Sequence, residues 1–265
     1  MRLITRARNL LAPKYQVPIK YWYRRSIGGL EPEMEWLKSI VLPGERAIDV
    51  GGNRGIYAYA LSRQGVRVEV FEPHLDCCRV LREWARKHDA VTVHAVALSS
   101  RTGLATLRVP IDQDGVEHDA SGSLETCAAP SIREQSVAVT TLDSYHFDRV
   151  SLIKIDVEGH ECAVLEGAIE TIAMSAPALL VEIEQRHIAR PINQAFDYIL
   201  SLGYRGFFMA GRTLLPLRCF EPSRHQPPTI VGVSSVAYVN NFLFLPLSGL
   251  GAGRYSSFSG GRLPE

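Results

Sequence analysis

The chain has 265 residues, of which 46% are hydrophobic and 22% charged, and its formal net charge is +1. These values exclude a collagen-like, coiled-coil or wholly disordered protein, and a balance so close to neutral does not indicate a nucleic-acid-binding protein. The five cysteines (Cys77, Cys78, Cys127, Cys162 and Cys219) form no C-x-x-C pair. We therefore expect a reducing, cytoplasmic environment, without a disulfide framework or a zinc site.

Residues 1–30 form a basic arm that carries a charge of +7 and no acidic residue, whereas the remaining 22 basic and 28 acidic residues carry −6. Apolar residues between Leu3 and Leu11 recur at helical spacing, and Pro13 and Pro18 are expected to end that helix. The arm either packs on the body of the protein or makes weak contact with an anionic membrane surface. No apolar run is long enough to span a membrane.

From residue 45 onward, strands alternate with helices, which predicts crossover connections and a parallel sheet. Strands are expected at 45–50, 66–71, 91–96, 105–110, 136–142, 150–156, 177–184, 204–210 and 241–246, and helices at 55–64, 74–88, 164–172 and 192–200. The polar insert 99–135 interrupts this rhythm, and we expect it to form a lid or part of the acceptor pocket. The Gly- and Ser-rich tail, 248–265, is expected to be flexible.

A glycine loop, from Asp49 to Gly55, follows the first of these strands and precedes a helix. Such a turn brings backbone N–H groups and a helix N-terminus close to a ligand. A dinucleotide-binding loop needs glycine at relative positions one, three and six. Counting from Gly51 as position one, position three is Asn53 and position six is Ile56. Because a side chain at the third position obstructs a pyrophosphate, the loop favours a nucleoside ligand that lacks one.

Glu72 ends the next strand, 23 residues after Asp49. An acid at this place can accept hydrogen bonds from both hydroxyl groups of a ribose, although a solvated strand end is the simpler interpretation of Glu72 alone. Together, the loop and Glu72 predict a ribose-bearing ligand at the carboxyl edge of the sheet.

Charged residues also gather at the end of strand 150–156, where Lys154, Asp156, Glu158 and Glu161 follow one another closely. Asp156, at the strand tip, is expected to face the ligand. Glu158 either acts in the site or only stabilises the positive N-terminus of the next helix. Glu182, inside an apolar strand, needs a salt-bridge partner, a solvent-facing position or a functional role. His187, just beyond that strand, is either solvated or a base within reach of the site.

The motifs resemble those of the FkbM-type S-adenosylmethionine-dependent methyltransferases in order and spacing. The matching strings are AIDVGGNRGIYAYAL, VEVFEP, AVALS, LIKIDVEGHE with VLEGA, and LLVEIE, flanked by GLEPEMEWL and NFLFLP. The resemblance covers roughly residues 28–246, with small departures at Gly52 and His160. It implies an α/β, Rossmann-like class I methyltransferase domain at 31–247, with a mostly parallel seven-stranded sheet and helices on both faces.

The resemblance also implies S-adenosylmethionine as cofactor, and we assign no metal-binding residue. The pocket for its methionine half would be formed by Asp49, Gly51, Asn53 and Gly55. Glu72 would hold the ribose, and the adenine would lie near Ala97, Leu98 and Ser99. The proton-accepting base and the groups that orient the acceptor would come from Asp156, Glu158, Glu182 and His187.

The function that the resemblance implies is O-methylation of a small-molecule or glycan acceptor, on a hydroxyl of a sugar, glycolipid, polysaccharide or secondary metabolite. Methylation of nucleic acid or protein is an alternative. Against nucleic acid stand the acidic body and the string Asp156-Val157-Glu158-Gly159, which replaces the Asn/Asp-Pro-Pro-Tyr element typical of base methylation. A non-catalytic cofactor-binding domain is the third possibility.

Overall fold

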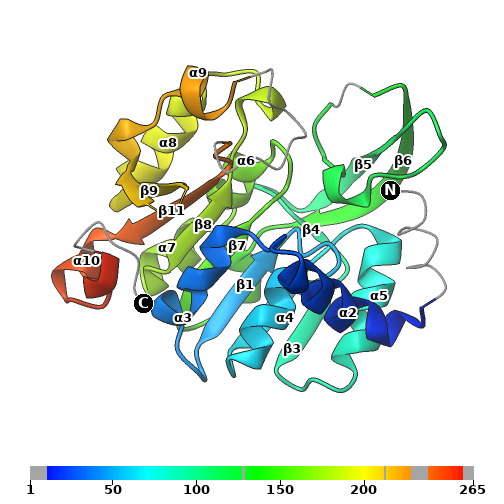
Figure 1. Ribbon diagram of the computed structural model, residues 1–265, viewed down its shortest axis with the longest axis horizontal. Coiled ribbons are helices and arrows are strands. Elements are labelled where there is room, and N and C mark those ends of the chain that lie inside the picture. The colour runs from blue at the N-terminus through cyan, green and yellow to red at the C-terminus, as the bar shows by residue number, and fades with distance from the viewer. Residues whose placement is uncertain (1–10, 127–128, 212, 228–237, 259–265) are drawn as a thin grey trace.

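The structure, a computed structural model, describes residues 11–126, 129–211, 213–227 and 238–258. Its main sheet contains eight strands (Figure 1): β1 (Arg46–Val50), β2 (Arg67–Phe71), β3 (Val91–His94), β7 (Val150–Ile155), β8 (Ala178–Glu182), β9 (Tyr204–Ala210), β10 (Thr213–Pro216) and β11 (Asn241–Pro246). Their order across the sheet is β10-β9-β11-β8-β7-β1-β2-β3. The first three strands and β7 and β8 run parallel, while β9, β10 and β11 pair antiparallel.

Helices cover both faces of this sheet, as expected. One buried hydrophobic cluster joins one face of the sheet to α2 (Pro13–Ser26), α3 (Leu37–Ile40), α4 (Ile56–Arg63) and α5 (Leu75–Ala85). A second cluster joins the other face to α6 (Glu161–Glu166), α7 (Ile169–Ser175) and α8 (Ile192–Ser201). Neighbouring strand residues alternate between the clusters, as Ala47 and Ile48 do, because successive side chains of a strand point to opposite faces. The strands are therefore apolar on both faces, as in buried parallel sheets.

The order in which the chain adds strands to the sheet reverses between β1 and β7. From β1 the chain builds outward to β2 and β3, and it later returns to place β7 and β8 on the other side of β1. In open α/β sheets, ligands bind beyond the carboxyl ends of the strands at such a switch point. The topology therefore indicates the carboxyl ends of β1 and β7 as the place to look for a site.

The sheet differs from the seven-stranded expectation by one strand. The extra strand is β10, a four-residue edge strand that pairs only with β9 and carries too few residues to show a periodic pattern. The insert and the residues on either side of it form a separate three-stranded sheet in the order β4-β6-β5, of which β5 and β6 lie at the upper right of Figure 1. Its strands are β4 (Ala97–Leu98), β5 (Gly103–Ile111) and β6 (Ser131–Thr140), and a short 3-10 helix, η2 (Asp119–Ser121), lies between β5 and β6.

The N-terminal segment differs from the sequence expectation. The helix expected between Leu3 and Leu11 falls almost entirely on residues 1–10, which lie outside the described residues. Pro13 is the first residue of α2, and Pro18 lies inside α2 and does not end it. A proline is compatible with a first turn, and the carbonyl that Pro18 leaves without its helical donor belongs to exposed Lys14. Fully buried Val17 anchors α2 on α4 and α5. No helix among the described residues is long and apolar enough to cross a membrane.

The structure describes the tail as far as residue 258. Tyr255 and Phe258 are almost fully buried, and the Phe258 ring meets Trp36 edge to face at 6.2 Å between centroids. Two aromatic side chains are enough to hold a segment that is otherwise rich in small residues. Residues 259–265 and Cys127 lie outside the described residues.

Candidate functional site

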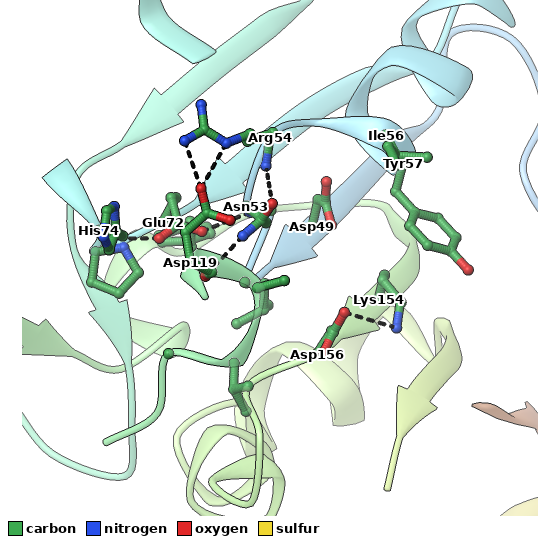
Figure 2. Close-up of a pocket in the computed structure, with 18 of the residues that line it drawn as sticks. Asp49, Asn53, Arg54, Ile56, Tyr57, Glu72, His74, Asp119, Lys154 and Asp156 are labelled. Carbon is green, nitrogen blue, oxygen red and sulfur yellow. Dashed lines mark hydrogen bonds and ion pairs between the residues drawn. The ribbon is translucent and has the colours of Figure 1, made fainter. Parts of the chain in front are cut away.

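A pocket opens at the carboxyl ends of β1, β2 and β7 (Figure 2). Val50 pairs with Phe71 on one side and with Ile155 on the other, so the three strands end level. The next residues of the three strands are therefore neighbours at one edge of the sheet: Gly51, Glu72 and Asp156. This edge is the switch point indicated by the topology.

Gly51 allows the loop after β1 to touch the end of β7. Its φ is 76°, in the left-handed region, and a Cβ built on it would lie 1.8 Å from the carbonyl oxygen of Asp156. Any larger residue would therefore push the two strand ends apart. Gly55 does not line the pocket. A Cβ built on it would lie 2.7 Å from Leu81 and 3.2 Å from Val17, so Gly55 allows close packing of the loop against α2 and α5.

Glu72 is buried at the rim of the pocket and holds the glycine loop. Its carboxylate accepts hydrogen bonds from the backbone N–H of Asn53, at 2.6 Å, and from that of His74, at 2.7 Å. Burial raises the pKa of Glu72 to about 7, although the two backbone donors oppose this shift. Each carboxylate oxygen still has a lone pair available to a ligand hydroxyl.

Asp49 is buried beneath the loop, and its Oδ2 atom has no hydrogen-bond partner among the described residues. Burial raises the pKa of Asp49 to about 6, while Lys154 acts in the opposite direction. A buried acceptor without a partner is costly unless a ligand donates to it. Asp49 is therefore suited to a ligand group that is cationic or donates hydrogen bonds.

The opposite wall of the pocket is apolar and includes Phe71, Ala97, Leu98 and Leu107. Ser99, expected beside them, does not line the pocket; its hydroxyl lies 2.9 Å from Nε2 of His160, which does. Ala97 and Leu98 thus line the pocket directly, whereas Ser99 contacts it only through His160.

Lys154 is the centre of the polar end of the pocket. It is 1% exposed, its Nζ donates to Oδ1 of Asn241 at 3.1 Å, and it lies 3.9 Å from a carboxylate oxygen of each of Asp156 and Glu182. Figure 2 shows its ammonium group beside the ring of Tyr57, 5.2 Å from the ring centroid. Burial alone would lower the pKa of Lys154, but the surrounding carboxylates raise it above its usual value.

Asp156 faces this pocket beside Lys154, as expected. Burial raises the pKa of its carboxyl to about 7, and the ammonium group of Lys154 opposes the shift. Glu182 lies behind Lys154, outside the pocket lining, and accepts a hydrogen bond from Asn240. Burial and the neighbouring Asp156 raise the pKa of Glu182 well above its usual value. Asp156 is therefore, like Glu72, a pocket carboxyl that can exchange a proton with a ligand near neutral pH, and it is the one of the two that lies beside Lys154.

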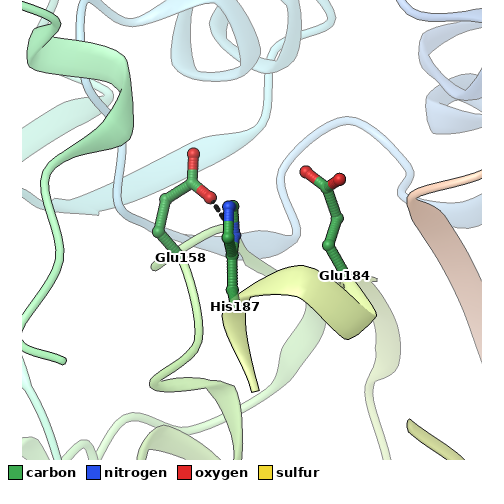
Figure 3. A group of neighbouring side chains, drawn as sticks. All are labelled: Glu158, Glu184 and His187. Carbon is green, nitrogen blue, oxygen red and sulfur yellow. Dashed lines mark ion pairs between the residues drawn. The ribbon is translucent and has the colours of Figure 1, made fainter. Parts of the chain in front are cut away.

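Glu158 and His187 lie next to the pocket and do not line it. Figure 3 shows the ion pair between Glu158 and His187, with Glu184 beside it. A carboxylate oxygen of each glutamate and a ring nitrogen of His187 lie within 4.8 Å of one another, close enough to be ligands of one metal ion. Burial acts to lower the pKa of His187, but Glu158 raises it above its usual value. Arg186 donates two hydrogen bonds to the carboxylate of Glu184. The negative charges of Glu158 and Glu184 are therefore balanced by His187 and Arg186.

A group that we call the loop latch, Asn53, Arg54 and Asp119, closes the insert over the glycine loop. Nε of Arg54 donates to the carboxylate of Asp119 at 2.7 Å, and the side chain of Asn53 donates to the Asp119 carbonyl at 2.9 Å. Helix α2 braces the latch, because Gln16 accepts from Arg54 and Lys20 donates to Asn53. The insert and the basic segment thus both reach the pocket.

The structure brings most of the expected cofactor residues into one pocket: Asp49, Gly51, Asn53, Glu72, Ala97 and Leu98. Of the expected catalytic residues, only Asp156 lines it. The sequence reading overlooked Glu31 and Tyr57, although the Tyr57 hydroxyl donates to the Glu31 carboxylate within the pocket wall. Lys154 offered a signal, since a lysine inside an apolar strand and two residues before Asp156 must share its face.

A protein-family model described as "Methyltransferase FkbM domain" matches residues 49–206. The match spans more than half of the chain and includes the glycine loop, Glu72 and Asp156. The chain belongs to the FkbM methyltransferase family. This confirms the resemblance and the Rossmann-like α/β fold that it implied.

Solved methyltransferase structures resemble this family member at low sequence identity. An FkbM methyltransferase from Methylobacillus flagellatus KT is 20% identical, with a TM-score of 0.49, over 89% of this chain and 56% of that chain. The precorrin-6y C5,15-methyltransferase from Geobacter metallireducens GS-15 is 9% identical, with a TM-score of 0.45, over 81% and 86% of the two chains. A SAM-dependent O-methyltransferase from Thermotoga maritima is 13% identical, with a TM-score of 0.41, over 82% and 66%.

This chain therefore spans just over half the length of the Methylobacillus flagellatus protein. A comparison with curated proteins found no match.

Proposed function

We propose that this FkbM-family protein is an S-adenosylmethionine-dependent O-methyltransferase that acts on a hydroxyl of a sugar, glycolipid, polysaccharide or secondary metabolite. The observation that carries the proposal is the position of Asp156. A carboxyl with a pKa near 7 lies beside a buried lysine, in the same pocket as the loop residues that suit the cofactor.

The pocket residues fit the cofactor on three counts. The orphaned Oδ2 of Asp49 suits the positively charged amine of the methionine part. Gly51 lets the glycine loop lie against the end of β7, which brings the loop and Asp156 together at one edge of the pocket. Glu72 can accept the ribose hydroxyls, and the wall formed by Phe71 and Leu98 suits the adenine ring.

When bound, S-adenosylmethionine supplies a methyl group on a positively charged sulfur. The protein must align the acceptor, exclude water and remove the hydroxyl proton. Asp156 accepts that proton at its carboxylate oxygen. Lys154 favours the ionised form of Asp156, and Asn241 holds Lys154 in place. The insert excludes water, because the loop latch keeps it over the pocket.

A hydroxyl-rich acceptor is supported by the polar end of the pocket. Carboxylates accept hydrogen bonds from hydroxyl groups, and Glu31 and Asp156 both line this end. Lys154 and the Tyr57 hydroxyl add polar groups between them. A sugar, with several adjacent hydroxyls, matches such a set better than an apolar acceptor does.

The acceptor class can be tested with S-adenosylmethionine that carries a tritiated methyl group. The protein is incubated with a cell extract, which is then separated into small-molecule, lipid, polysaccharide, nucleic-acid and protein fractions. We expect the label in the small-molecule, lipid or polysaccharide fraction, as a methyl ether that is stable to base. Label in nucleic acid or protein would contradict the proposed acceptor, and absence of label despite cofactor binding would indicate a non-catalytic domain.

The role of Asp156 can be tested with Asp156→Asn. The amide cannot accept the hydroxyl proton, so the turnover number should fall by roughly 100-fold or more, which is typical for the loss of a general base. Binding of S-adenosylhomocysteine, measured by calorimetry, should change little. Asp148→Asn is the matched control, since Asp148 is exposed just before the other end of β7. Near-normal turnover by Asp156→Asn would remove Asp156 from the mechanism.

A further inference from the structure

Helix α2 has an outer face on which three large apolar side chains stay about half exposed, although the indole N–H of Trp22 donates to the Tyr59 hydroxyl of α4 at 3.2 Å. Tyr15, Ile19 and Trp22 are 52%, 46% and 47% exposed, and their spacing places them on one side of the helix. The inner side of the helix carries buried Gln16 and Val17. We call the exposed set, together with its flanking cations, the α2 outer face.

Positive charge surrounds this apolar strip. The guanidinium of Arg25 lies 5.6 Å from the ring centroid of Trp22, and that of Arg63, from α4, lies 5.5 Å from it. Exposed Lys14 stands beside Tyr15, with its Nζ 4.9 Å from the ring centroid. No acidic residue occurs among the first thirty residues of the chain. The α2 outer face is thus aromatic, aliphatic and cationic, without a carboxylate of its own.

We propose that the α2 outer face docks the protein on an anionic lipid bilayer. Aromatic residues settle at the level of the lipid headgroups, aliphatic side chains enter the acyl boundary, and nearby Lys and Arg residues are attracted by anionic lipids. A second copy of the chain fits less well, because a two-fold contact would bring the same cations against each other. Nucleic acid fits less well too, because phosphates offer no contact for Ile19.

The docking is peripheral and reversible. The apolar residues lie on a helix that stays packed on α4 and α5, so only side chains can enter the bilayer. Attraction to the headgroups is electrostatic and acts within about 8–10 Å at physiological salt. Binding should therefore require anionic lipid and weaken as the salt concentration rises.

Tryptophan fluorescence can measure this docking directly. The chain has three tryptophans, and Trp36 and Trp84 are buried, so Trp22 is the one that vesicles can reach. The full-length protein, without cofactor or acceptor, is mixed with vesicles of equimolar phosphatidylcholine and phosphatidylglycerol. We expect a blue shift of the emission and quenching by brominated lipid. Vesicles of phosphatidylcholine alone should give neither effect.

The variant Tyr15→Ser/Ile19→Ser keeps the Trp22 signal and removes apolar surface from the face. We expect its vesicle affinity to fall by about tenfold or more, since burying an apolar side chain is worth roughly 1.5–3 kcal/mol. The matched control is Met174→Ser, which removes an exposed apolar side chain from α7. Unchanged binding of S-adenosylhomocysteine by both variants verifies the fold and separates this test from the proposed function.

Three results would overturn the proposal. The first is equal binding by the wild-type chain and the double variant, which would locate any membrane contact elsewhere. The second is binding to neutral and anionic vesicles alike. The third is evidence that something else occupies the face. Light scattering would then show a dimer, or an oligonucleotide would bind, and the double variant would abolish that association. In the same case vesicles would leave the emission of Trp22 unchanged.

Discussion

Glu72 fixes the backbone of Asn53 and is also the carboxylate best placed for a ribose. Glu72→Ala removes the acceptors of both tasks, so ligand affinity and the stability of the ligand-free loop are measured separately. We expect Glu72→Ala to weaken binding of S-adenosylhomocysteine by about tenfold or more, as measured by calorimetry, because hydrogen bonds to a charged group are worth about 1.5–3 kcal/mol.

The control for this measurement is Asp76→Ala, four residues further along the chain and exposed at the first turn of α5. Thermal unfolding of the ligand-free variants shows whether the loop survives the loss of its carboxylate. Full affinity in a folded Glu72→Ala protein would exclude the ribose assignment.

Residues that follow a strand directly could be predicted from the sequence, because the carboxyl ends of parallel strands meet at one edge. Glu72 and Asp156 belong to this group, and Asp49, the next-to-last residue of β1, lies at the same edge. Residues whose position depends on a later turn could not. His187 lies in η4 (Gln185–His187), where its carbonyl packs against Gly159, and its ring therefore pairs with Glu158 beside the pocket. Nothing in the sequence fixes that contact.

At the level of elements, the loop latch connects the insert, the glycine loop and α2. The Arg54 side chain is buried, so loss of its charge would leave Asp119 without that partner. Breaking a buried ion pair by removing one member costs about 3–5 kcal/mol. We expect Arg54→Gln to speed limited proteolysis within residues 115–123 several-fold, and S-adenosylhomocysteine to slow the cleavage less than in the wild-type protein.

Arg133→Gln is the matched control for the latch, because Arg133 pairs with Glu117 in the same insert but at its exposed surface. It should leave the cleavage rate nearly unchanged, as exposed ion pairs contribute little. Equal cleavage of Arg54→Gln and the wild-type protein would mean that the latch does not hold the insert.

The elements predicted best were those with a strong period and clear ends. The strand at 45–50, followed by glycines, became β1, and the helix at 192–200 became α8. Helix α2 was not predicted, because Pro18 lies within it and because the packing around Val17 that holds the helix in place cannot be read from the sequence. Strand β4 has two residues, which is too short for any periodic pattern.

In the whole molecule, α2 separates two regions of opposite charge. Its outer face is cationic, whereas its inner side borders a pocket rich in carboxylates. Lys20 stands at this boundary, half-buried, and burial lowers its pKa to about 8. The pocket lining also holds Lys20, Arg24, Arg54 and Lys154, so its carboxylates exceed its Lys and Arg side chains by only one, whereas the outer face carries cations without carboxylates. The near-neutral net charge is therefore an average over two surfaces of different charge, which the two proposals assign to a cationic cofactor and an anionic bilayer.

The same carboxyls make the stability of the protein depend on pH. Burial raises the pKa to about 6 for Asp49 and to about 7 for Glu33, Glu72, Asp156 and Glu161. Between the ordinary values near 4 and these raised values, the folded chain holds protons that the unfolded chain has released. Raising the pH through this window therefore lowers the free energy of unfolding. The lowered pKa of His74 acts in the opposite direction, but it is a single group.

We expect urea unfolding of the ligand-free protein to give a larger free energy at about pH 5.5 than at about pH 8. The difference should exceed about 1.4 kcal/mol, the effect of one group shifted by one pKa unit. Glu72→Gln cannot ionise and should reduce this difference, whereas Asp76→Asn, at an exposed position, should not. A free energy of unfolding that rises steadily over this range would show that the pocket carboxyls are ionised without cost, and that the pocket is open to water when no cofactor is bound.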